Sequence, residues 1–141
     1  AILKGEKNAS FRSHVILEHA LYTCQRAVRT NDWFYIRTYH PGIYNFDKIT
    51  LFDMKNDPNQ VENVADRYSD IVKEMDHLLV EWVHENGLNP SHPPDPMQKV
   101  IQTGPWKYIT PERWVRILQQ KGDDKAASRI KKLYPERFES K

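Results

Sequence analysis

The chain has 141 residues, of which 39% are hydrophobic and 28% are charged, and its net charge is +2. This length leaves room for one domain with a core of moderate size. The two signs of charge are mixed, so the composition gives no electrostatic argument for a nucleic-acid partner. The sequence holds no run of about 18 apolar residues of the kind that spans a membrane. Its single cysteine, Cys24, excludes an internal disulfide and a metal site built on several cysteines.

The first half of the chain predicts an antiparallel sheet. Residues 22–30 alternate in polarity, and residues 33–39 are rich in β-branched and aromatic side chains. The two residues between them, 31–32, are Asn and Asp and suit a tight turn, so the two runs predict a β-hairpin. A short apolar run at residues 14–17 and another at residues 48–54 extend the hairpin. The result is a meander of three or four strands.

The clearest helical pattern covers residues 66–86. Apolar side chains recur there in steps of three and four, which is typical of a helix with one buried face. Gly87 follows as a natural stop. Sheet and helix each need the other to bury an apolar side. The predicted fold class is therefore α+β: an antiparallel sheet of about four strands covered by one long helix, then a short helical tail.

Proline and glycine divide the rest of the chain. Four prolines make residues 88–96 an extended linker, and residues 97–102 suit one short helical segment. Residues 110–121 begin with Thr and Pro, which favour a helix start, and a last helix capped by Asp123 or Asp124 ends before Pro135. We expect three parts: a subdomain at residues 1–87, a Pro-rich linker at residues 88–109 and a helical tail at residues 110–141.

The histidines do not form a recognisable metal site. His14 and His19 are five residues apart and fall on opposite faces of an alternating strand. His77 and His84 are seven apart on the predicted helix, with no acidic residue clearly shared. None of these spacings matches a ligand pattern such as His-Glu-x-x-His. We predict no metal site within this chain.

The other chemistry-bearing residues have structural interpretations. Cys24 in a predicted strand is interpreted as a small buried apolar residue. Asp53 and Asp57 could serve acid–base chemistry, but a turn ahead of a helix explains them better, since they can accept hydrogen bonds from turn amides. Arg26 and Arg29 are expected in ion pairs or at the solvated surface. These residues alone provide no catalytic constellation.

The stretch from residue 51 to residue 65 organises the chain, because an apolar strand end there enters an Asp-Pro turn and then a helix. This stretch resembles the C-terminal signature of the sulfatase family. In that signature Leu-Tyr/Phe-Asp-Leu/Met is followed by two variable residues, Asp-Pro, and then Asn-Leu/Val-Ala. The matching residues are Leu51, Phe52, Asp53, Met54, Asp57, Pro58, Asn63, Val64 and Ala65.

Further motifs, in the order in which the family has them, extend the resemblance across most of residues 3–121. The first is a segment of leucine, basic residue and glycine at Leu3-Lys4-Gly5. An Arg-x-Val-Arg-Thr strand follows at residues 26–30, and an aromatic strand at residues 33–36. Two tail motifs of some bacterial members come last, Asp-Pro-Met at residues 95–97 and Gly-Pro-Trp at residues 104–106.

The resemblance implies that the chemistry lies outside this chain. Sulfatases resemble alkaline phosphatases, and their large N-terminal domain carries a formylglycine nucleophile, made in a Cys/Ser-x-Pro-Ser-Arg motif, and the acidic ligands of calcium. This sequence has neither motif, and residues 24–28 depart from the first at every position that matters. The chain thus resembles the C-terminal subdomain of a sulfuric ester hydrolase. The start at Ala1, with no initiator Met, also indicates a processed chain or a piece of a longer one.

The resemblance also implies partners and a location. The first expected partner is the missing N-terminal catalytic domain, and the substrate of the parent enzyme would be a sulfated small molecule or glycan. Relatives of this type are often periplasmic or secreted. Two residues are candidates for a substrate-binding role, His19 in a strand-end loop and Trp106 in an aromatic cluster. No catalytic residue and no metal ligand is assigned to this chain.

A second interpretation belongs to another class of protein. The chain would then be a free-standing, non-catalytic binding or scaffold module that shares only the subdomain fold. An apolar surface on one side of the sheet favours the sulfatase interpretation, because a missing domain would cover it. A surface that is polar all round favours the free-standing module.

Overall fold

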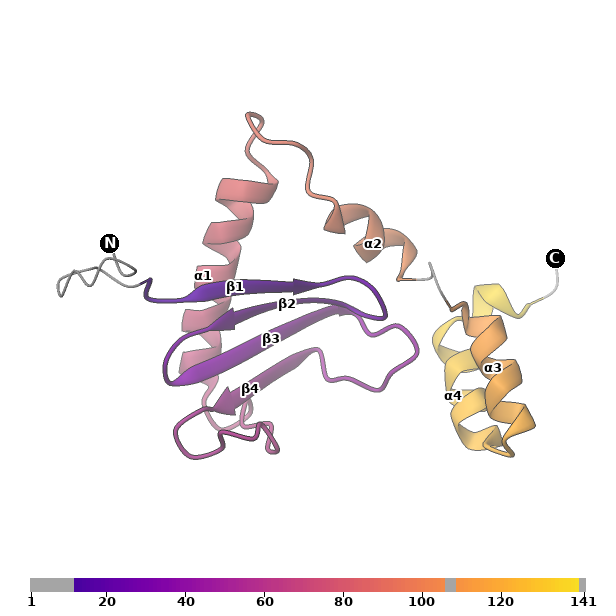
Figure 1. Ribbon diagram of the computed structural model, residues 1–141. Helices are drawn as coiled ribbons and strands as arrows, with labels where there is room; N and C mark the ends of the chain where they lie inside the picture. Colours follow the sequence, from indigo (N-terminus) through magenta and orange to yellow (C-terminus); the bar gives the residue numbers. More distant parts are fainter. Residues whose placement is uncertain (1–11, 106–108, 140–141) are drawn as a thin grey trace, which may run out of the picture.

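The computed structural model of the chain describes residues 12–105 and 109–139. The chain forms a four-stranded sheet. Figure 1 shows a long helix behind this sheet and a helical hairpin beyond its end. None of the helices in the described ranges combines the length and the apolar character that a membrane span requires. The elements are β1 (Val15–His19), β2 (Cys24–Arg29), β3 (Trp33–His40), β4 (Ile49–Asp53), α1 (Ser69–Gly87), α2 (Met97–Thr103), α3 (Pro111–Gln120), α4 (Asp124–Leu133) and η2 (Pro135–Arg137).

The sheet is the predicted antiparallel meander, in the order β1-β2-β3-β4. The predicted hairpin between β2 and β3 is confirmed, and its turn is closed by a 2.9 Å hydrogen bond from the Thr30 amide to the Trp33 carbonyl. The pairing register aligns Val28 with Tyr35, and Tyr35 with Leu51. Because strand side chains alternate between faces, these three residues lie on the same face of the sheet.

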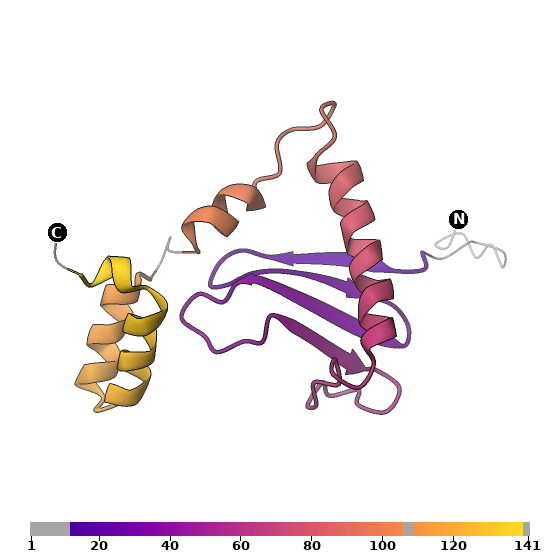
Figure 2. The same cartoon turned by 180° about the vertical axis from the view of Figure 1, so that it is seen from behind.

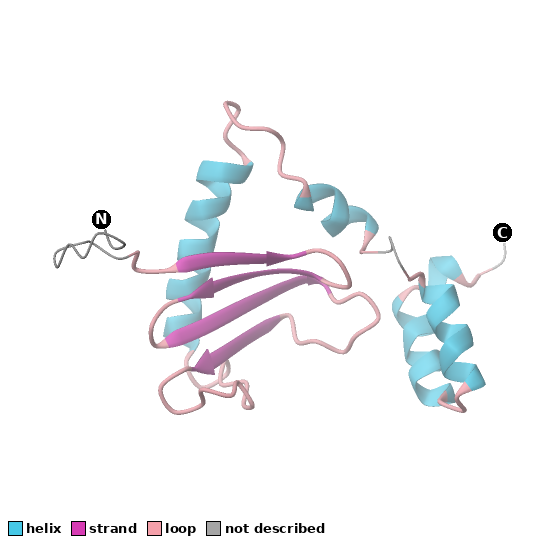
Figure 3. Ribbon diagram, viewed as in Figure 1, coloured by secondary structure: helices cyan, strands magenta, loops and turns pink. Residues whose placement is uncertain are grey.

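That face is covered by α1, as predicted, so the α+β fold class is confirmed. Seen from behind, α1 crosses in front of the sheet, and the other face carries no helix within the described residues (Figures 2 and 3). The two layers close around a hydrophobic core. Its fully or nearly fully buried members are Val28, Tyr35, Leu51, Val64, Met75 and Leu79.

The helix α1 begins three residues later than residue 66, where the apolar pattern placed its start. The amides of Arg67 and Tyr68 both donate to the Val64 carbonyl, at 3.0 and 3.3 Å, so this segment is a turn. At the other end Gly87 is the last helical residue, and Leu88 follows in an ordinary αR conformation. A side chain at Gly87 would lie 3.4 Å from Asp95, so the glycine allows a close approach of the linker.

The tail forms two short helices joined at Gly122, as predicted. Thr110 caps α3 by accepting a hydrogen bond from the Arg113 amide at 3.3 Å, and Asp123 caps α4 through the Ala126 amide at 3.0 Å. The hairpin turns at Gly122, whose φ of +76° lies in the left-handed region that glycine adopts readily. The sequence pattern therefore places both helices within a residue or two.

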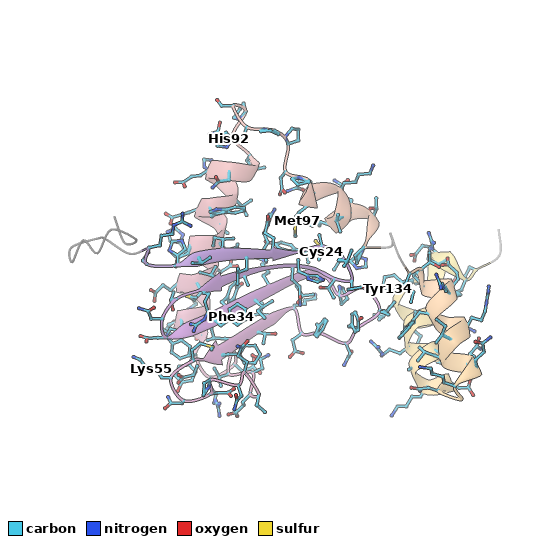
Figure 4. All side chains as sticks on the ribbon, in the orientation of Figure 1. Cys24, Phe34, Lys55, His92, Met97 and Tyr134 are labelled. Atoms are coloured by element: carbon cyan, nitrogen blue, oxygen red, sulfur yellow. The ribbon has the colours of Figure 1, made fainter. Side chains whose placement is uncertain are left out.

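A second hydrophobic cluster joins this hairpin to the sheet. Its buried members are Val115, Ala127, Ile130 and Tyr134 from the tail, and Ile43 from the β3–β4 loop. The Tyr134 hydroxyl donates to the Gly42 carbonyl, and Figure 4 labels Tyr134 at this junction. The predicted division of the chain into three parts stays a prediction, although Ile43 shows that the hairpin shares a core with a loop of the sheet.

The tail also holds an ion pair whose pH dependence can be measured. Hydrogen bonds from Arg137 and from the Thr110 hydroxyl lower the pKa of Glu112 from 4.5 to about 2. Because this pKa is depressed in the folded protein, the pair stabilises the fold above about pH 4.5, and the contribution disappears as the pH falls toward 2. The two side chains are 41% and 37% exposed, so solvent screening keeps the contribution small.

We expect an NMR titration of the Glu112 carboxyl carbon to give a midpoint near 2 in the wild-type chain. Arg137→Gln should move the midpoint up toward the ordinary value of 4.5, because the principal hydrogen-bond donor is lost. Lys131→Gln on the neighbouring helix removes a positive charge without touching the pair and is the control. Equal midpoints in the wild-type and Arg137→Gln chains would contradict the prediction.

Candidate functional site

The signature stretch of residues 51–65 forms a strand, a turn and the approach to a helix, as expected. Asp53 accepts hydrogen bonds from the amides of Lys55 and Asn56 at 3.0 and 3.1 Å. Asp57 accepts from the amides of Val61 and Glu62 at 2.7 and 2.9 Å. Hydrogen bonds from Asn56 in particular lower the pKa of the Asp53 carboxyl. The predicted hydrogen bonds from turn amides to both carboxylates are confirmed.

Asn63 ties the end of this turn back to the sheet. Its side-chain oxygen accepts from the Leu51 amide at 3.0 Å and from the Ala65 amide at 3.1 Å. Its amide nitrogen donates to Asp47 at 3.0 Å and to the Ile49 carbonyl at 3.2 Å. All the hydrogen-bonding positions of this side chain are therefore used to fix β4 relative to the segment that leads into α1.

His19, one of the two predicted substrate-binding residues, lies at the exposed end of β1. Its ring stacks on Tyr22 with 6.4 Å between the centroids, and Nε2 accepts a 3.4 Å hydrogen bond from the Tyr22 amide. These contacts fold the β1–β2 loop back on the strand end. Trp106, the other predicted residue, lies outside the described residues, so the substrate-binding role of this pair stays a prediction.

The β1–β2 loop meets the β3–β4 loop at Gly42. A Cβ atom at Gly42 would lie 2.1 Å from the Tyr22 carbonyl oxygen, and φ there is +62°, so this position requires glycine. Beside it, the ring of His40 stacks on Tyr134 with 5.6 Å between centroids, and burial lowers the pKa of His40. The β3–β4 loop carries Tyr44, which is exposed. This end of the sheet thus gathers histidine side chains from the ends of β1 and β3 and tyrosine side chains from the two loops.

On the face covered by α1, the same end of the sheet holds a buried charge cluster. The Arg26 side chain is 2% exposed, and its guanidinium binds Asp95 at 2.6 Å and Glu18 at 2.7 Å. The guanidinium carbon lies 5.6 Å from the centroid of the Trp82 ring and 6.0 Å from that of Tyr39. Burial alone would lower the pKa of Arg26, but its hydrogen bonds to the two carboxylates raise it. Arg26 is therefore charged, and its guanidinium is bound by the two carboxylates.

Cys24 lies in the same strand as Arg26 and is fully buried, as the sequence predicts. Burial raises the pKa of its thiol to about 11. The thiolate is the nucleophilic form of cysteine, so this thiol is chemically quiet at neutral pH. Across the described ranges, 12–105 and 109–139, no three His, Cys, Asp or Glu side chains are grouped so as to hold a metal ion.

The sheet face away from α1 carries apolar side chains together with polar ones, among them Gln25, Arg29, Thr38 and Thr50, and no described helix covers it. The register brings Leu17, Ala27 and Ile36 into one row across the strands. The adjacent row places Phe34 beside Phe52, with 6.4 Å between ring centroids. We call this surface the open sheet face. Its apolar members are Val15, Leu17, Ala27, Phe34, Ile36 and Phe52, and Figure 4 labels Phe34.

Exposure on this face is greatest along the edge strand. Val15 is 44% exposed and Leu17 is 46% exposed, while Phe34, Ile36 and Phe52 are half-buried. An antiparallel sheet that faces water on one side normally carries polar residues there. The open sheet face combines such polar residues with exposed apolar side chains along β1, and an exposed apolar patch of this kind marks a candidate contact surface.

Comparison with known proteins gives a limited result. No family model and no curated protein matches the chain. Among solved structures, one neighbour is a Bacteroides thetaiotaomicron sulfatase (BT33336S-sulf), from work on a genetic locus for the metabolism of multiple glycosaminoglycans. It is 25% identical with a TM-score of 0.42 and covers 53% of this chain. Another is a candidate sulfatase of Bacteroides fragilis, yidJ, 23% identical with a TM-score of 0.41 over 62% of this chain.

The chain spans 17% of the length of each of these two neighbours. At such TM-scores the likeness carries no argument for activity.

Proposed function

We propose that the chain is the C-terminal region of a sulfatase, a sulfuric ester hydrolase whose catalytic domain lies outside this chain. In this proposal the region packs on the catalytic domain and helps to shape its substrate pocket. The formylglycine nucleophile and the calcium ligands belong to the catalytic domain. The chain itself binds and positions, and it contributes no reacting group.

The open sheet face is the observation that carries this proposal. Val15 and Leu17 each leave nearly half of their side-chain surface in water. The half-buried rings of Phe34 and Phe52 lie on the same face, with Arg29 between Val15 and Phe34. Burying such side chains stabilises a contact by about 25 cal/mol for each Å² of apolar surface removed from water. Packing a large rigid domain against this face would bury these side chains, and the contact would be stabilised by that free energy. A free-standing module would more naturally keep this face polar.

The signature residues give independent support from the sequence. Asp53, Asp57 and Asn63 match the family pattern, and each of them makes hydrogen bonds that fix the junction between β4 and α1. The junction sets how the helix lies across the sheet. These three signature residues thus hold the junction between the two layers together.

The pocket-shaping role is assigned to the end of the sheet that carries His19. His19 is the last residue of β1, and its ring is exposed. Val15 and Leu17 of the same strand form the edge of the open sheet face. The β1–β2 loop follows directly after His19. A partner seated on that face would therefore lie next to His19. We propose that His19, with Trp106, contacts the substrate of the parent enzyme.

The first experiment is to sequence the coding DNA upstream of Ala1. An in-frame Cys/Ser-x-Pro-Ser-Arg motif, together with paired upstream aspartates, supports the proposal. A start codon close to Ala1 favours the free-standing module instead.

Where the motif is found, the two parts are expressed separately and mixed. We expect the wild-type chain to co-elute with the catalytic domain on gel filtration, and Leu17→Asp to abolish co-elution because it places a charge on the open sheet face. Val80→Asp is the matched control, since Val80 is 51% exposed on α1. Retention of co-elution by Leu17→Asp would refute this docking surface.

A further inference from the structure

Charge is divided unevenly along the chain. Residues 1–108 hold 12 Lys or Arg and 14 Asp or Glu, whereas residues 109–141 hold nine and five. The first part is therefore net negative, and the tail is net positive by four charges. A sign difference between two parts of a chain is one of the sequence signals of a basic segment that contacts an anionic partner.

The two parts also differ in how their cations are engaged. Within residues 12–105, ion pairs with carboxylates involve Arg26, Arg37, Lys55, Arg67 and Lys73. Within residues 109–139, the ion pair between Arg137 and Glu112 is the single one that the structure contains. The lysines of α4 have no carboxylate partner in either described range. Their charge is available to a ligand.

A groove of about 830 Å³ runs along α4 and is lined by two of these lysines and by Arg129. Lys125, Arg129 and Lys132 line it, in steps of four and three residues. With a rise of about 1.5 Å per residue, they form a row about 10 Å long on one face of the helix. Arg129 is held in place by a 3.0 Å hydrogen bond from its guanidinium to the Ile43 carbonyl.

The rest of the groove lining is mixed in character. Leu133 and Ala126 provide apolar surface, and Ser128 provides a hydroxyl. The one acidic member, Asp123, is engaged as the cap of α4 through the Ala126 amide. No aromatic side chain lines the groove, so it offers no platform on which nucleic-acid bases would stack.

We propose that the α4 groove binds a sulfated polysaccharide through the row Lys125, Arg129 and Lys132. A row about 10 Å long exceeds a single small anion and suits a polymer with repeated anionic groups. The apolar lining suits the non-polar faces of sugar rings. The choice of sulfate as the anion depends on the function proposed above, whereas the polyanion site depends only on this chain.

The test uses the full chain and immobilised dextran sulfate, with neutral dextran of the same length as the reference. We expect binding to dextran sulfate alone, weakening as salt is raised from 50 to 300 mM. Lys125→Glu with Lys132→Glu should raise the dissociation constant about tenfold or more. The matched control, Lys131→Glu with Lys99→Glu, makes the same change in net charge and should leave it within about twofold.

Three outcomes would overturn the site. Equal loss of binding in both double variants would mean that net charge, and not the groove, determines binding. Equal binding to dextran and dextran sulfate would exclude an anion site. Tighter binding to duplex DNA than to dextran sulfate would make nucleic acid the partner. None of these results depends on the catalytic domain, so failure here is distinguishable from failure of the co-elution experiment above.

Discussion

Asp95→Ala should lower the free energy of unfolding by about 3 kcal/mol, the largest effect that we expect of a single substitution outside the core. The change leaves the Arg26 guanidinium, which is 2% exposed, with Glu18 as its remaining carboxylate partner. An incompletely compensated buried charge is costly because the protein interior solvates it poorly. Urea denaturation followed by tryptophan fluorescence measures the change.

Two further variants separate the causes of this loss. Asp95→Asn removes the charge but keeps an oxygen that can accept the 2.9 Å hydrogen bond from the Met97 amide, so its effect should lie between wild type and Asp95→Ala. Glu81→Ala breaks an exposed pair with His77 and should change stability by no more than about 0.5 kcal/mol. A loss below about 1 kcal/mol in Asp95→Ala would show that the buried pair does not hold the linker on the sheet.

Ile130→Ala should destabilise the tail by about 3 kcal/mol, since it leaves a cavity in the cluster that joins α3 and α4 to the β3–β4 loop. Ile130 is fully buried within a cluster of other hydrophobic side chains that pack together, so its truncation leaves a cavity. Hydrogen exchange monitored by mass spectrometry should show faster exchange in residues 111–133 and little change in β2 and β3.

The control for this prediction is Leu133→Ala. Leu133 is 46% exposed on the same helix, so its truncation should cost no more than about 0.5 kcal/mol. Uniform acceleration of exchange across the sheet and the tail in Ile130→Ala would contradict the prediction. Such a result would mean that sheet and hairpin open as a single cooperative unit.

Much of the fold was predictable because its patterns are local. The alternation of residues 22–30, the Asn-Asp turn and the helical steps along α1 each depend on neighbours in the sequence, and each predicted element is present. The caps at Thr110 and Asp123 and the turn at Gly122 were predictable for the same reason. The start of α1 was not predictable from the sequence. The amides of Arg67 and Tyr68 both donate to the Val64 carbonyl and form a turn before the helix, and apolar periodicity does not indicate such a turn.

The long-range contacts could not be predicted from the sequence. Arg26 and Asp95 are 69 residues apart, and nothing in a run of prolines indicates that one aspartate will be buried against a strand. The register that pairs Glu18 with Arg26, and the joining of Ile43 to the tail, likewise depend on how the elements come together. The open sheet face required both the register and the position of α1, because polarity alternation in single strands does not say which face is covered.

Cys24 gives this protein an internal reporter of its own motions. The thiol is fully buried two residues from Arg26, and its raised pKa keeps it protonated in the closed protein. A thiol reagent can modify it only in molecules in which this end of the sheet has opened. The rate at which the reagent modifies Cys24 at neutral pH therefore measures how often the sheet end opens, and the measurement needs no engineered label.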